Sequence, residues 1–344
     1  MIPPPAVPVA AFALALVTAL VLTPLTIRAA WATRYVDHPR AHKLHGAPTP
    51  LLGGVAVFVA ALIAWLVCLF AGGTHGSRDV AGLLAGACVV LGLGLWDDRH
   101  GMQPPVKLAG QATAAAILLA TAGVPDLGLG VVVNVAITLT ALVALMNAIN
   151  FLDNMNGMVA GLAPIALAAF AWTSVARGAW GVAAAELAVA GACVGFLRFN
   201  FPKARLFLGD AGSLFLGYSL GASAVLTFNA APPGWGRLGP VIVLAYPVFD
   251  MIFVVITRLR GGRKVYLGGR DHTNHRLASV LRCPTRTVQI LWLNGVALSA
   301  SGLVVLSLNR PMPALLLLGL WTTALFTAGI RLSSVPIAPP PASP

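Results

Sequence analysis

The feature that most constrains this chain is a series of apolar runs, each close to the twenty or so residues that an α-helix needs to cross a bilayer. Eleven such runs occur, at about 7–28, 52–70, 80–96, 108–123, 131–149, 159–176, 180–197, 213–229, 239–257, 288–308 and 314–330. Only 9% of the residues are charged and 58% are hydrophobic, a composition typical of proteins that fold in lipid. The sequence therefore predicts an all-α, polytopic integral membrane protein with about 10–11 transmembrane helices.

The basic residues indicate how these helices are oriented. With the amino terminus outside, eighteen of the 22 Lys and Arg residues fall on one side of the membrane, and the other four are Arg78, Arg177, Arg237 and Arg310. The positive-inside rule assigns the basic side to the cytosol, so the amino terminus is predicted outside and the carboxyl terminus inside. Membrane orientation therefore explains the net charge of +12 without a nucleic-acid partner.

The loops between the runs are short, because the longest has only about thirty residues. Residues 1–334 are therefore predicted to form a single transmembrane domain, and the Pro-rich tail at 335–344 is predicted to be disordered. The four cysteines form no CxxC pair and are expected to serve in packing.

Most of the ten acidic residues lie on the predicted cytosolic side. Six of them come from five different loops: Asp37, Asp97, Asp98, Asp153, Asp210 and Asp271. Charge close to hydrocarbon is costly and is usually retained for function. We therefore expect these loops to form one composite site at the cytosolic face.

Asp210 stands between two glycines at the predicted start of a long apolar helix, in the stretch Leu206-Phe207-Leu208-Gly209-Asp210-Ala211-Gly212-Ser213. A helix start carries unpaired N–H groups and a partial positive charge, so it favours an anion, either the aspartate itself or a phosphate beside it. Aspartate is also a preferred N-cap, and for this motif alone capping explains the residue equally well. The other loop carboxylates favour a functional role.

Two adjacent carboxylates, Asp97 and Asp98, end the predicted third helix, and Lys107 follows nine residues after the second. Neighbouring side chains on a helix diverge by about 100°, so the two acids must have different roles. One can hold a metal ion while the other orients a cation or accepts a proton, a division suited to displacement at phosphorus. Lys107 is a candidate phosphate ligand. The alternative is an exposed acidic helix end.

Three asparagines, Asn147, Asn150 and Asn154, fall at i, i+3 and i+7 on one helical face, beside Asp153. This pattern predicts a polar, substrate-binding surface. Amides inside membrane helices also join neighbouring helices by hydrogen bonds, which is an alternative for Asn147 alone.

Two further loops carry groups that suit phosphate. The first contains Lys43 and Thr49 before a turn shaped by prolines and glycines, although membrane topology would also explain its basic charge. The second places Asn200 beside Lys203 and Arg205, shortly before the Asp210 turn, and is a candidate site for a diphosphate.

The last long loop contains two histidines, His272 and His275, between Arg270 and Arg276. Histidines at this spacing could bind zinc, but no Cys ligand or HExxH motif accompanies them. Imidazoles together with guanidinium groups better suit an anionic substrate.

These loops, in this order, resemble the polyprenyl-phosphate N-acetylhexosamine-1-phosphate transferases (glycosyltransferase family 4). That family includes the enterobacterial-antigen type GlcNAc-1-phosphate transferases and the phospho-MurNAc-pentapeptide translocases. The matching motifs are Pro48-Thr49-Pro50 with Gly53-Gly54, Asp97-Asp98, Asn147-x-x-Asn150-x-x-Asp153, Phe207-Leu208-Gly209-Asp210-x-Gly212-Ser213 and the histidines at 272–275. The resemblance covers nearly the whole chain, and its motifs are specific jointly rather than singly.

The resemblance implies a phosphoglycosyltransferase of the bacterial cytoplasmic membrane, active at the cytosolic face and dependent on Mg²⁺, with Mn²⁺ as an alternative. It implies transfer of a sugar 1-phosphate from a UDP-N-acetylhexosamine to undecaprenyl phosphate, with release of UMP, as the first membrane step of a cell-surface polysaccharide. The family pattern matches catalytic positions to Asp97, Asp98, Asp210, His272 and His275, and the metal to Asp210, Asp153 and Asp98. A homodimer is a further expectation.

Two departures from the family pattern concern the sugar. The family often has D-G-x-D-G after its NxxNxxD motif, whereas Asn154 and Asn156 stand here, so Asn156 offers only a neutral amide. The histidine motif is commonly H-x-H-H, whereas here Asn274 precedes His275. Because Asn274 is short and neutral, it could bind an acetamido or hydroxyl group but offers no charge to a peptide carboxylate. UDP-GlcNAc is therefore the favoured donor.

Two other functions stay open on this evidence. The first is the transfer of phospho-MurNAc-pentapeptide. The second is membrane transport, in which intramembrane acids bind ions near the bilayer midplane, but here the acids gather in loops and no inverted repeat is apparent. For the enzyme, direct attack by the lipid phosphate and a covalent phospho-aspartate on Asp97 or Asp98 also both stay open.

Overall fold

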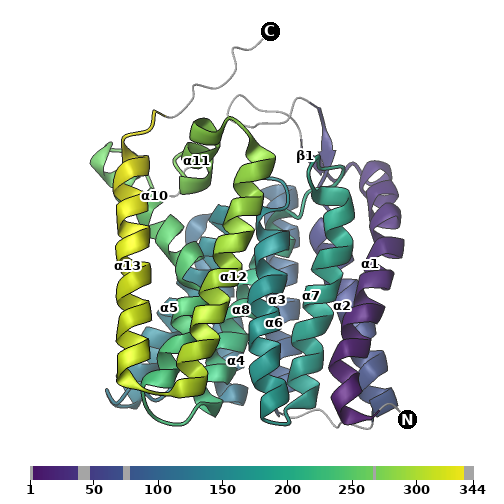
Figure 1. Cartoon of the computed structure of the whole chain (residues 1–344). Helices are drawn as coiled ribbons and strands as arrows, with labels where there is room; N and C mark the ends of the chain where they lie inside the picture. The colour runs from purple at the N-terminus through teal and green to yellow at the C-terminus, as the bar shows by residue number, and fades with distance from the viewer. Residues whose placement is uncertain (1–2, 38–46, 73–77, 266–268, 337–344) are drawn as a thin grey trace.

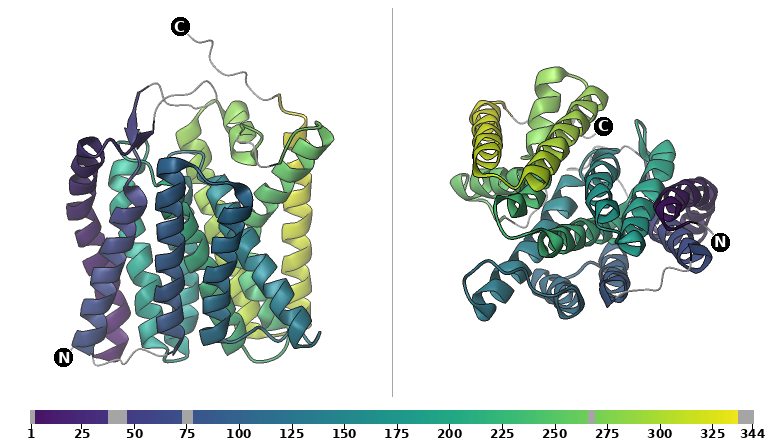
Figure 2. Two further views of the ribbon diagram at one scale, coloured as in Figure 1. Left: turned by 180° about the vertical axis from the view of Figure 1, so that it is seen from behind. Right: turned by 60° about the horizontal axis from the view of Figure 1, so that its bottom comes forward.

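A computed structural model describes residues 3–37, 47–72, 78–265 and 269–336 of the chain. The elements, in chain order, are η1 (Pro4–Ala6), α1 (Val7–Ala32), β1 (Val36–Asp37), β2 (Thr49–Pro50), α2 (Gly53–Gly72), α3 (Arg78–His100), α4 (Pro104–Ala122), α5 (Val131–Leu152), α6 (Met158–Ala176), α7 (Trp180–Asn200), α8 (Gly209–Ala230), η2 (Trp235–Leu238), α9 (Gly239–Val243), α10 (Ala245–Arg260), α11 (Thr273–Leu281), α12 (Pro284–Leu308) and α13 (Pro311–Ser333). The long helices run side by side as a bundle, with α1 at one edge and α13 at the other (Figure 1). The first and last helices lie on opposite sides of the bundle in both views of Figure 2.

The prediction of an all-α membrane protein with 10–11 spans is confirmed. Within the described residues, ten helices are long and apolar enough to cross a membrane. The eleventh candidate is a bent pair, Trp235–Val243 and Ala245–Arg260, whose halves meet at 63°. Pro247 supplies no N–H for the carbonyl of Val243, which favours a break here, and the ninth predicted run forms two helices instead of one.

Two short elements lie at the upper end of the bundle in Figure 1, where the sequence predicted only loops. β1 and β2 pair antiparallel, with Val36 opposite Pro50 and Asp37 opposite Thr49. The other element is the nine-residue helix α11. Both segments are shorter than the windows in which hydrophobic periodicity identifies a helix or strand.

α8 is the most buried spanning helix, with 83% of its apolar span inside the protein, compared with 11% for α13. It packs against α2, α3, α5 and α6. The start of α8, where Asp210 lies, is therefore surrounded by the ends of other helices.

Glycines bring α2 and α3 close to the start of α8. A Cβ at Gly54 would collide with the backbone of Gly212, and a Cβ at Gly94 would collide with the backbone of Ala211. Small residues of this kind let helix backbones approach closely in membranes. The polar residues at the ends of these helices are thereby held in a fixed arrangement.

Candidate active site

Four helices bring polar side chains together at the start of α8. We call this group the acidic cluster, and its members are Asp97, Asp98, Lys107, Asn150 and Asp210. The Nζ atom of Lys107 lies 2.8 Å from Asp97 Oδ2 and 2.6 Å from Asp210 Oδ2. Residues from α3, α4, α5 and α8 thus meet, and of the six acids of the predicted composite site three lie in this cluster: Asp97, Asp98 and Asp210.

The two adjacent aspartates have different partners, as their divergence on the helix predicted. Asp97 faces the lysine, whereas Asp98 accepts hydrogen bonds from the backbone N–H groups of Asp210 at 2.8 Å and Ala211 at 3.1 Å. Gly209 has a φ of +74°, and a Cβ there would lie 2.7 Å from Asp98 Oδ2. Asp98 therefore caps α8 from a neighbouring helix, and the capping role considered for Asp210 is wrong.

Asn150 links the cluster to α5. Its Nδ2 donates to Asp210 Oδ1 and to Ser213 Oγ, each at 2.8 Å. Asn147, one turn earlier, instead donates to Gln111 Oε1 at 2.7 Å. Asn147 thus joins α5 to α4, which is the alternative that the sequence left open.

Asp153 follows the end of α5 and is influenced by the same carboxylates. Burial, and then the charges of Asp210 and Asp98, raise the pKa of Asp153 to about 8. The atoms that surround Lys107 Nζ are carboxylate and amide oxygens, which are the ligands that Mg²⁺ prefers. Within the described ranges, no group of three or more His, Cys, Asp or Glu side chains is arranged to hold a metal ion.

A second charged group, which we call the histidine segment, comprises residues 270–276 and leads into α11. A buried acid of α10, Asp250, holds its middle: Asp250 Oδ1 accepts from the backbone N–H of Thr273 at 2.8 Å and from Thr273 Oγ1 at 2.6 Å. Asp250 Oδ2 lies 2.7 Å from His272 Nδ1. Asp250 is not among the predicted site residues, although a charge inside an apolar run signals function.

Asp271 ties the same segment to the end of α10. Its carboxylate lies 3.1 Å from Arg258 Nε and 2.6 Å from Arg263 Nη2. Although burial opposes ionisation, Arg263 and Arg258 hold the pKa of Asp271 below its usual range. Asp271 is therefore an anchor for the histidine segment, with its charge already paired.

Two side chains of the histidine segment suit an anionic ligand. The Nε and Nη2 atoms of Arg270 are buried and have no hydrogen-bond partner among the described residues. Burial, and then the charges of His272 and Arg270, lower the pKa of His275 to about 4, so this imidazole is neutral near pH 7. An unpaired guanidinium beside a neutral imidazole suits a phosphate or diphosphate.

The end of α5 connects the acidic cluster with the histidine segment. The ring of Phe151 lies edge-on to that of His272, with 6.4 Å between centroids, and Asn154 Oδ1 accepts from Asn274 Nδ2 at 2.7 Å. Asn274 is completely buried, and its Oδ1 accepts from the backbone N–H of His275. Both polar groups of Asn274 are thus used inside the protein, so the predicted contact with the sugar is not supported.

Two other predicted substrate ligands stabilise the protein itself. Asn200, which is 5% exposed, accepts from the N–H of Gly157 and donates to the carbonyl of Leu206. Arg276 donates to three carbonyls at the end of α13, those of Leu332, Ser333 and Val335. Gly157 is far from Asn200 in the sequence, and the end of α13 is far from Arg276, while Leu206 lies in irregular backbone. The motifs alone could therefore not reveal these partners.

The first loop contributes little to the described site. Thr49 lies in β2, is 9% exposed and donates to the carbonyl of Ala47. Lys43 lies outside the described residues.

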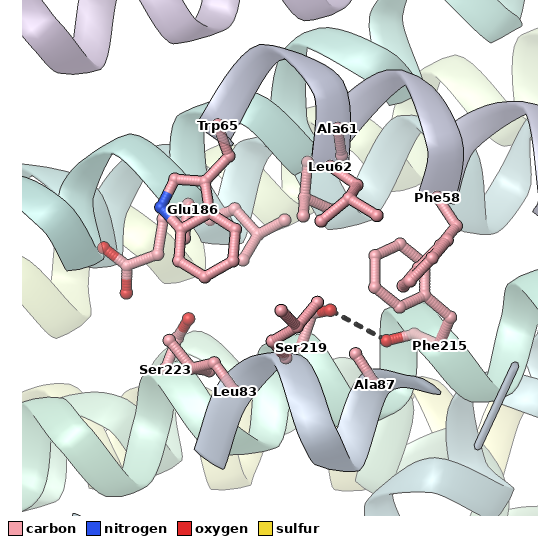
Figure 3. Close-up of a pocket in the computed structure, with 14 residues that line it drawn as sticks. Phe58, Ala61, Leu62, Trp65, Leu83, Ala87, Glu186, Phe215, Ser219 and Ser223 are labelled. Carbon is pink, nitrogen blue, oxygen red and sulfur yellow. Dashed lines mark hydrogen bonds between the residues drawn. The ribbon is translucent and has the colours of Figure 1, made fainter. Parts of the chain in front are cut away.

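A small cavity of about 60 Å³ lies between α2 and α3 on the surface of α8 (Figure 3). Its lining is mostly apolar and includes Trp65 and Phe215, with the buried Glu186 at one end. The α8 residues that line it begin five positions after Asp210, and each adds roughly 1.5 Å along a helix. The cavity therefore lies deeper along the spanning helices than the acidic cluster.

Comparisons with known proteins point to one family. Residues 80–228, which contain the whole acidic cluster, match the model of glycosyl transferase family 4. The probable undecaprenyl-phosphate N-acetylglucosaminyl 1-phosphate transferase of Bacillus subtilis (strain 168) is 30% identical over 309 residues, 87% of this chain and 85% of that protein. The decaprenyl-phosphate N-acetylglucosaminephosphotransferase of Mycobacterium tuberculosis (strain ATCC 25618 / H37Rv) is 34% identical over 304 residues, 77% and 75% of the two chains. The phospho-N-acetylmuramoyl-pentapeptide-transferase of Desulforudis audaxviator (strain MP104C) is 33% identical over 325 residues, 85% of this chain and 95% of that protein.

Proposed function

This chain belongs to glycosyl transferase family 4, and from that premise we propose that it transfers N-acetylglucosamine 1-phosphate from UDP-N-acetylglucosamine to a polyprenyl phosphate and releases UMP. The acceptor of this proposal is undecaprenyl phosphate, the lipid in the name of the Bacillus subtilis relative. The donor follows the N-acetylglucosaminyl group in the names of that relative and the mycobacterial one.

One observation carries the proposal: the acidic cluster, which is rich in carboxylate and amide oxygens, and Arg270 of the histidine segment are joined through the end of α5. Lys107 lies between the carboxylates of Asp97 and Asp210 in the acidic cluster. Arg270 of the histidine segment has buried nitrogen atoms without a partner among the described residues. A nucleotide diphosphate that binds with a divalent cation needs both kinds of group.

Mg²⁺ is part of the proposal, with Mn²⁺ as the alternative ion. Asp210 and Asp153 are the protein ligands that we propose, because Asp98, the third ligand expected from the family pattern, already accepts two backbone N–H groups. Mg²⁺ usually takes one or two protein carboxylates and completes its shell with water and substrate phosphate, so a cage of three side chains is not required. When bound, the ion would neutralise charge on the diphosphate oxygens.

In the proposed reaction, an oxygen of the lipid phosphate forms a bond to the β-phosphorus of the UDP-sugar. The bond between that phosphorus and the bridging oxygen breaks, and UMP leaves with the bridging oxygen. Lys107 neutralises phosphate oxygens during this exchange, and Arg270 donates to the diphosphate. Because the ion pair with Lys107 weakens Asp97 as a nucleophile, direct attack by the lipid phosphate is favoured over a phospho-aspartate.

The test is UMP release by the purified protein in lipid nanodiscs with undecaprenyl phosphate and Mg²⁺. The donors are UDP-GlcNAc, UDP-GalNAc and UDP-MurNAc-pentapeptide, and the control omits the acceptor lipid. We expect acceptor-dependent release of UMP from UDP-GlcNAc. Release only from UDP-MurNAc-pentapeptide would assign the chain to the other branch of the family, and no release from any donor would contradict a transferase.

We also propose that the acidic cluster faces the bacterial cytosol, because eighteen of the 22 Lys and Arg residues lie on that side of the predicted topology. The test is labelling of single cysteines by an impermeant thiol reagent in whole cells, after removal of the native cysteines. Lys203 is exposed near the start of α8, and Pro233 is exposed beyond its end. Pro233→Cys should react and Lys203→Cys should not, and the reverse pattern would place the cluster outside.

A further inference from the structure

Asp250 is buried, yet the partners of its carboxylate among the described residues all come from another part of the chain. Both oxygens bind the adjacent residues His272 and Thr273, at 2.6–2.8 Å. Its own helix, α10, starts at the bend after α9, and the histidine segment lies against it. An uncompensated charge at this depth would be costly, so the carboxylate and the histidine segment stabilise each other.

We propose that Asp250 is a positioning residue for the transfer reaction, holding the His272 ring so that its Nε2 atom is presented to the substrate diphosphate. This inference rests on the proposed function and adds a residue to it. An ionised carboxylate only accepts hydrogen bonds, so Nδ1 of His272 keeps its proton, and a second proton on Nε2 is the one that the ring can donate to a phosphate oxygen. The 2.7 Å contact between Nδ1 and Asp250 Oδ2 leaves Nε2 as the ring nitrogen on the side away from the carboxylate.

The surroundings of His272 support this assignment. The ring stands at 85° to Phe151 of α5 and at 71° to His275, so neighbours restrict it on two sides. Asn274, the second residue after His272, is bonded to Asn154 at the end of α5. The histidine is therefore fixed beside the helix end that also carries Asn150 and the rest of the acidic cluster.

A purely structural role for Asp250 makes different predictions. Asp250 accepts the backbone N–H of Thr273, and His272, the N-cap residue of α11, makes no capping bond with its own side chain. A carboxylate at a helix N-terminus stabilises the helix through capping and the helix dipole. On that view, replacement of Asp250 would reduce stability and activity together, whether or not His272 is present.

The experiment is a double-mutant cycle on kcat and KM with Asp250→Asn, His272→Asn and the double variant. Asp250→Asn keeps the shape of the side chain but removes the negative charge that balances a His272 ring protonated on both nitrogens. We expect kcat to fall by about 10–100-fold with little change in the KM for UDP-GlcNAc, as for other residues that orient a functional histidine. The double variant should be no slower than His272→Asn alone, because Asp250 acts through His272.

Two control variants separate positioning from stability. Thr273→Val removes the hydroxyl bond to Asp250 and should lower the Tm more than it lowers kcat. Glu186→Gln neutralises a buried acid of the Figure 3 cavity and should leave kcat unchanged. Two results would overturn the inference while the wild type is active. The first is that the losses of kcat of the two single variants multiply in the double variant, and the second is that the loss of kcat follows the Tm across all variants. A wild type that releases no UMP would overturn the proposed function and this inference together.

Discussion

The acidic cluster and the histidine segment lie side by side but are built in different ways. The acidic cluster sits on the ends of spanning helices, and glycine contacts between their backbones set its geometry. The histidine segment sits on a connection and a nine-residue helix, and charged side chains set its geometry, chiefly Asp250, Arg258 and Arg263. The first region is held by backbone packing and the second by buried polar bonds.

The two regions also differ in what they lack. In the acidic cluster, Asp97 and Asp210 share one lysine and Asp98 binds only backbone N–H groups, so the cluster can accept further positive charge. In the histidine segment, Asp250 and Asp271 are paired, whereas Nε and Nη2 of Arg270 have no partner among the described residues, so this region can accept negative charge. A diphosphate with its metal ion would supply the negative and the positive charge that the two regions can accept. Mutations in the two regions should therefore have different effects.

The largest effect should come from the acidic cluster. Asp210→Asn keeps the shape of the side chain but removes the charge that faces Lys107 and the proposed metal. We expect UMP release to fall by about 10³-fold or more, since charge stabilisation at phosphorus contributes several kcal/mol. Asp126→Asn, which changes an exposed acid, should keep normal activity. Near-normal turnover of Asp210→Asn at ordinary Mg²⁺ would remove the cluster from the mechanism.

The histidine segment should show a binding effect instead. Arg270→Gln removes the unpaired guanidinium, and we expect the KM for UDP-GlcNAc to rise by about 10–100-fold, the loss of one charge-assisted contact. Arg286→Gln, at an exposed position near the start of α12, is the matched control and should be silent. Arg276→Gln should lower the Tm with an unchanged KM, because Arg276 binds the end of α13. An unchanged KM for Arg270→Gln would show that the segment holds no diphosphate.

Asp153, which lies beside the acidic cluster, should make the stability depend on pH. The pKa of Asp153 is about 8 in the folded chain, compared with about 3.9 for an unperturbed aspartate. Between these values the folded chain keeps a proton that the unfolded chain has lost, so raising the pH from 4 to 8 lowers the free energy of unfolding. Asp153→Asn cannot ionise and should lose this dependence.

The measurement is the Tm of both proteins from pH 5 to pH 8 in a metal chelator. The Tm of Asp153→Asn should gain on that of the wild type as the pH rises, by an amount on the order of a few °C. Added Mg²⁺ should reverse the trend for the wild type only, since the proposed ligand is the ionised carboxylate. Parallel curves for the two proteins would mean that burial does not protonate Asp153.

The acidic cluster and the histidine segment also differ in how well the sequence predicted them. The spanning helices were predictable because each apolar run has to cover the bilayer alone. The exception was the break at Leu244, which Pro247 favours. The acidic cluster was predictable because Asp97, Lys107, Asn150 and Asp210 all end or begin such helices. Helix direction alone brings those ends to one face.

The histidine segment was less predictable because its partners are set by irregular backbone. Asn274 and Arg276 look like ligands in the sequence, yet the chain uses both internally, while Asp250 was missed because it lies inside an apolar run. A polar residue beside a motif can bind either substrate or its own backbone. Only the fold distinguishes these cases, since the partner of Arg276 is more than fifty residues away.

The smallest effect on chemistry should come from Asn274, where the two regions join. Asn274→Ala would leave Asn154 Oδ1 and the N–H of His275 without their partners, at a cost of about 1–3 kcal/mol in stability. If Asn274 only joins the regions, the ratio of kcat/KM values for UDP-GlcNAc and UDP-GalNAc should not change, because a completely buried amide cannot discriminate between sugars. The measurement is that ratio for the wild type and the variant, with the Tm as evidence that the bridge is lost. A ratio that shifts tenfold while the Tm stays constant would restore Asn274 as a residue that reads the sugar.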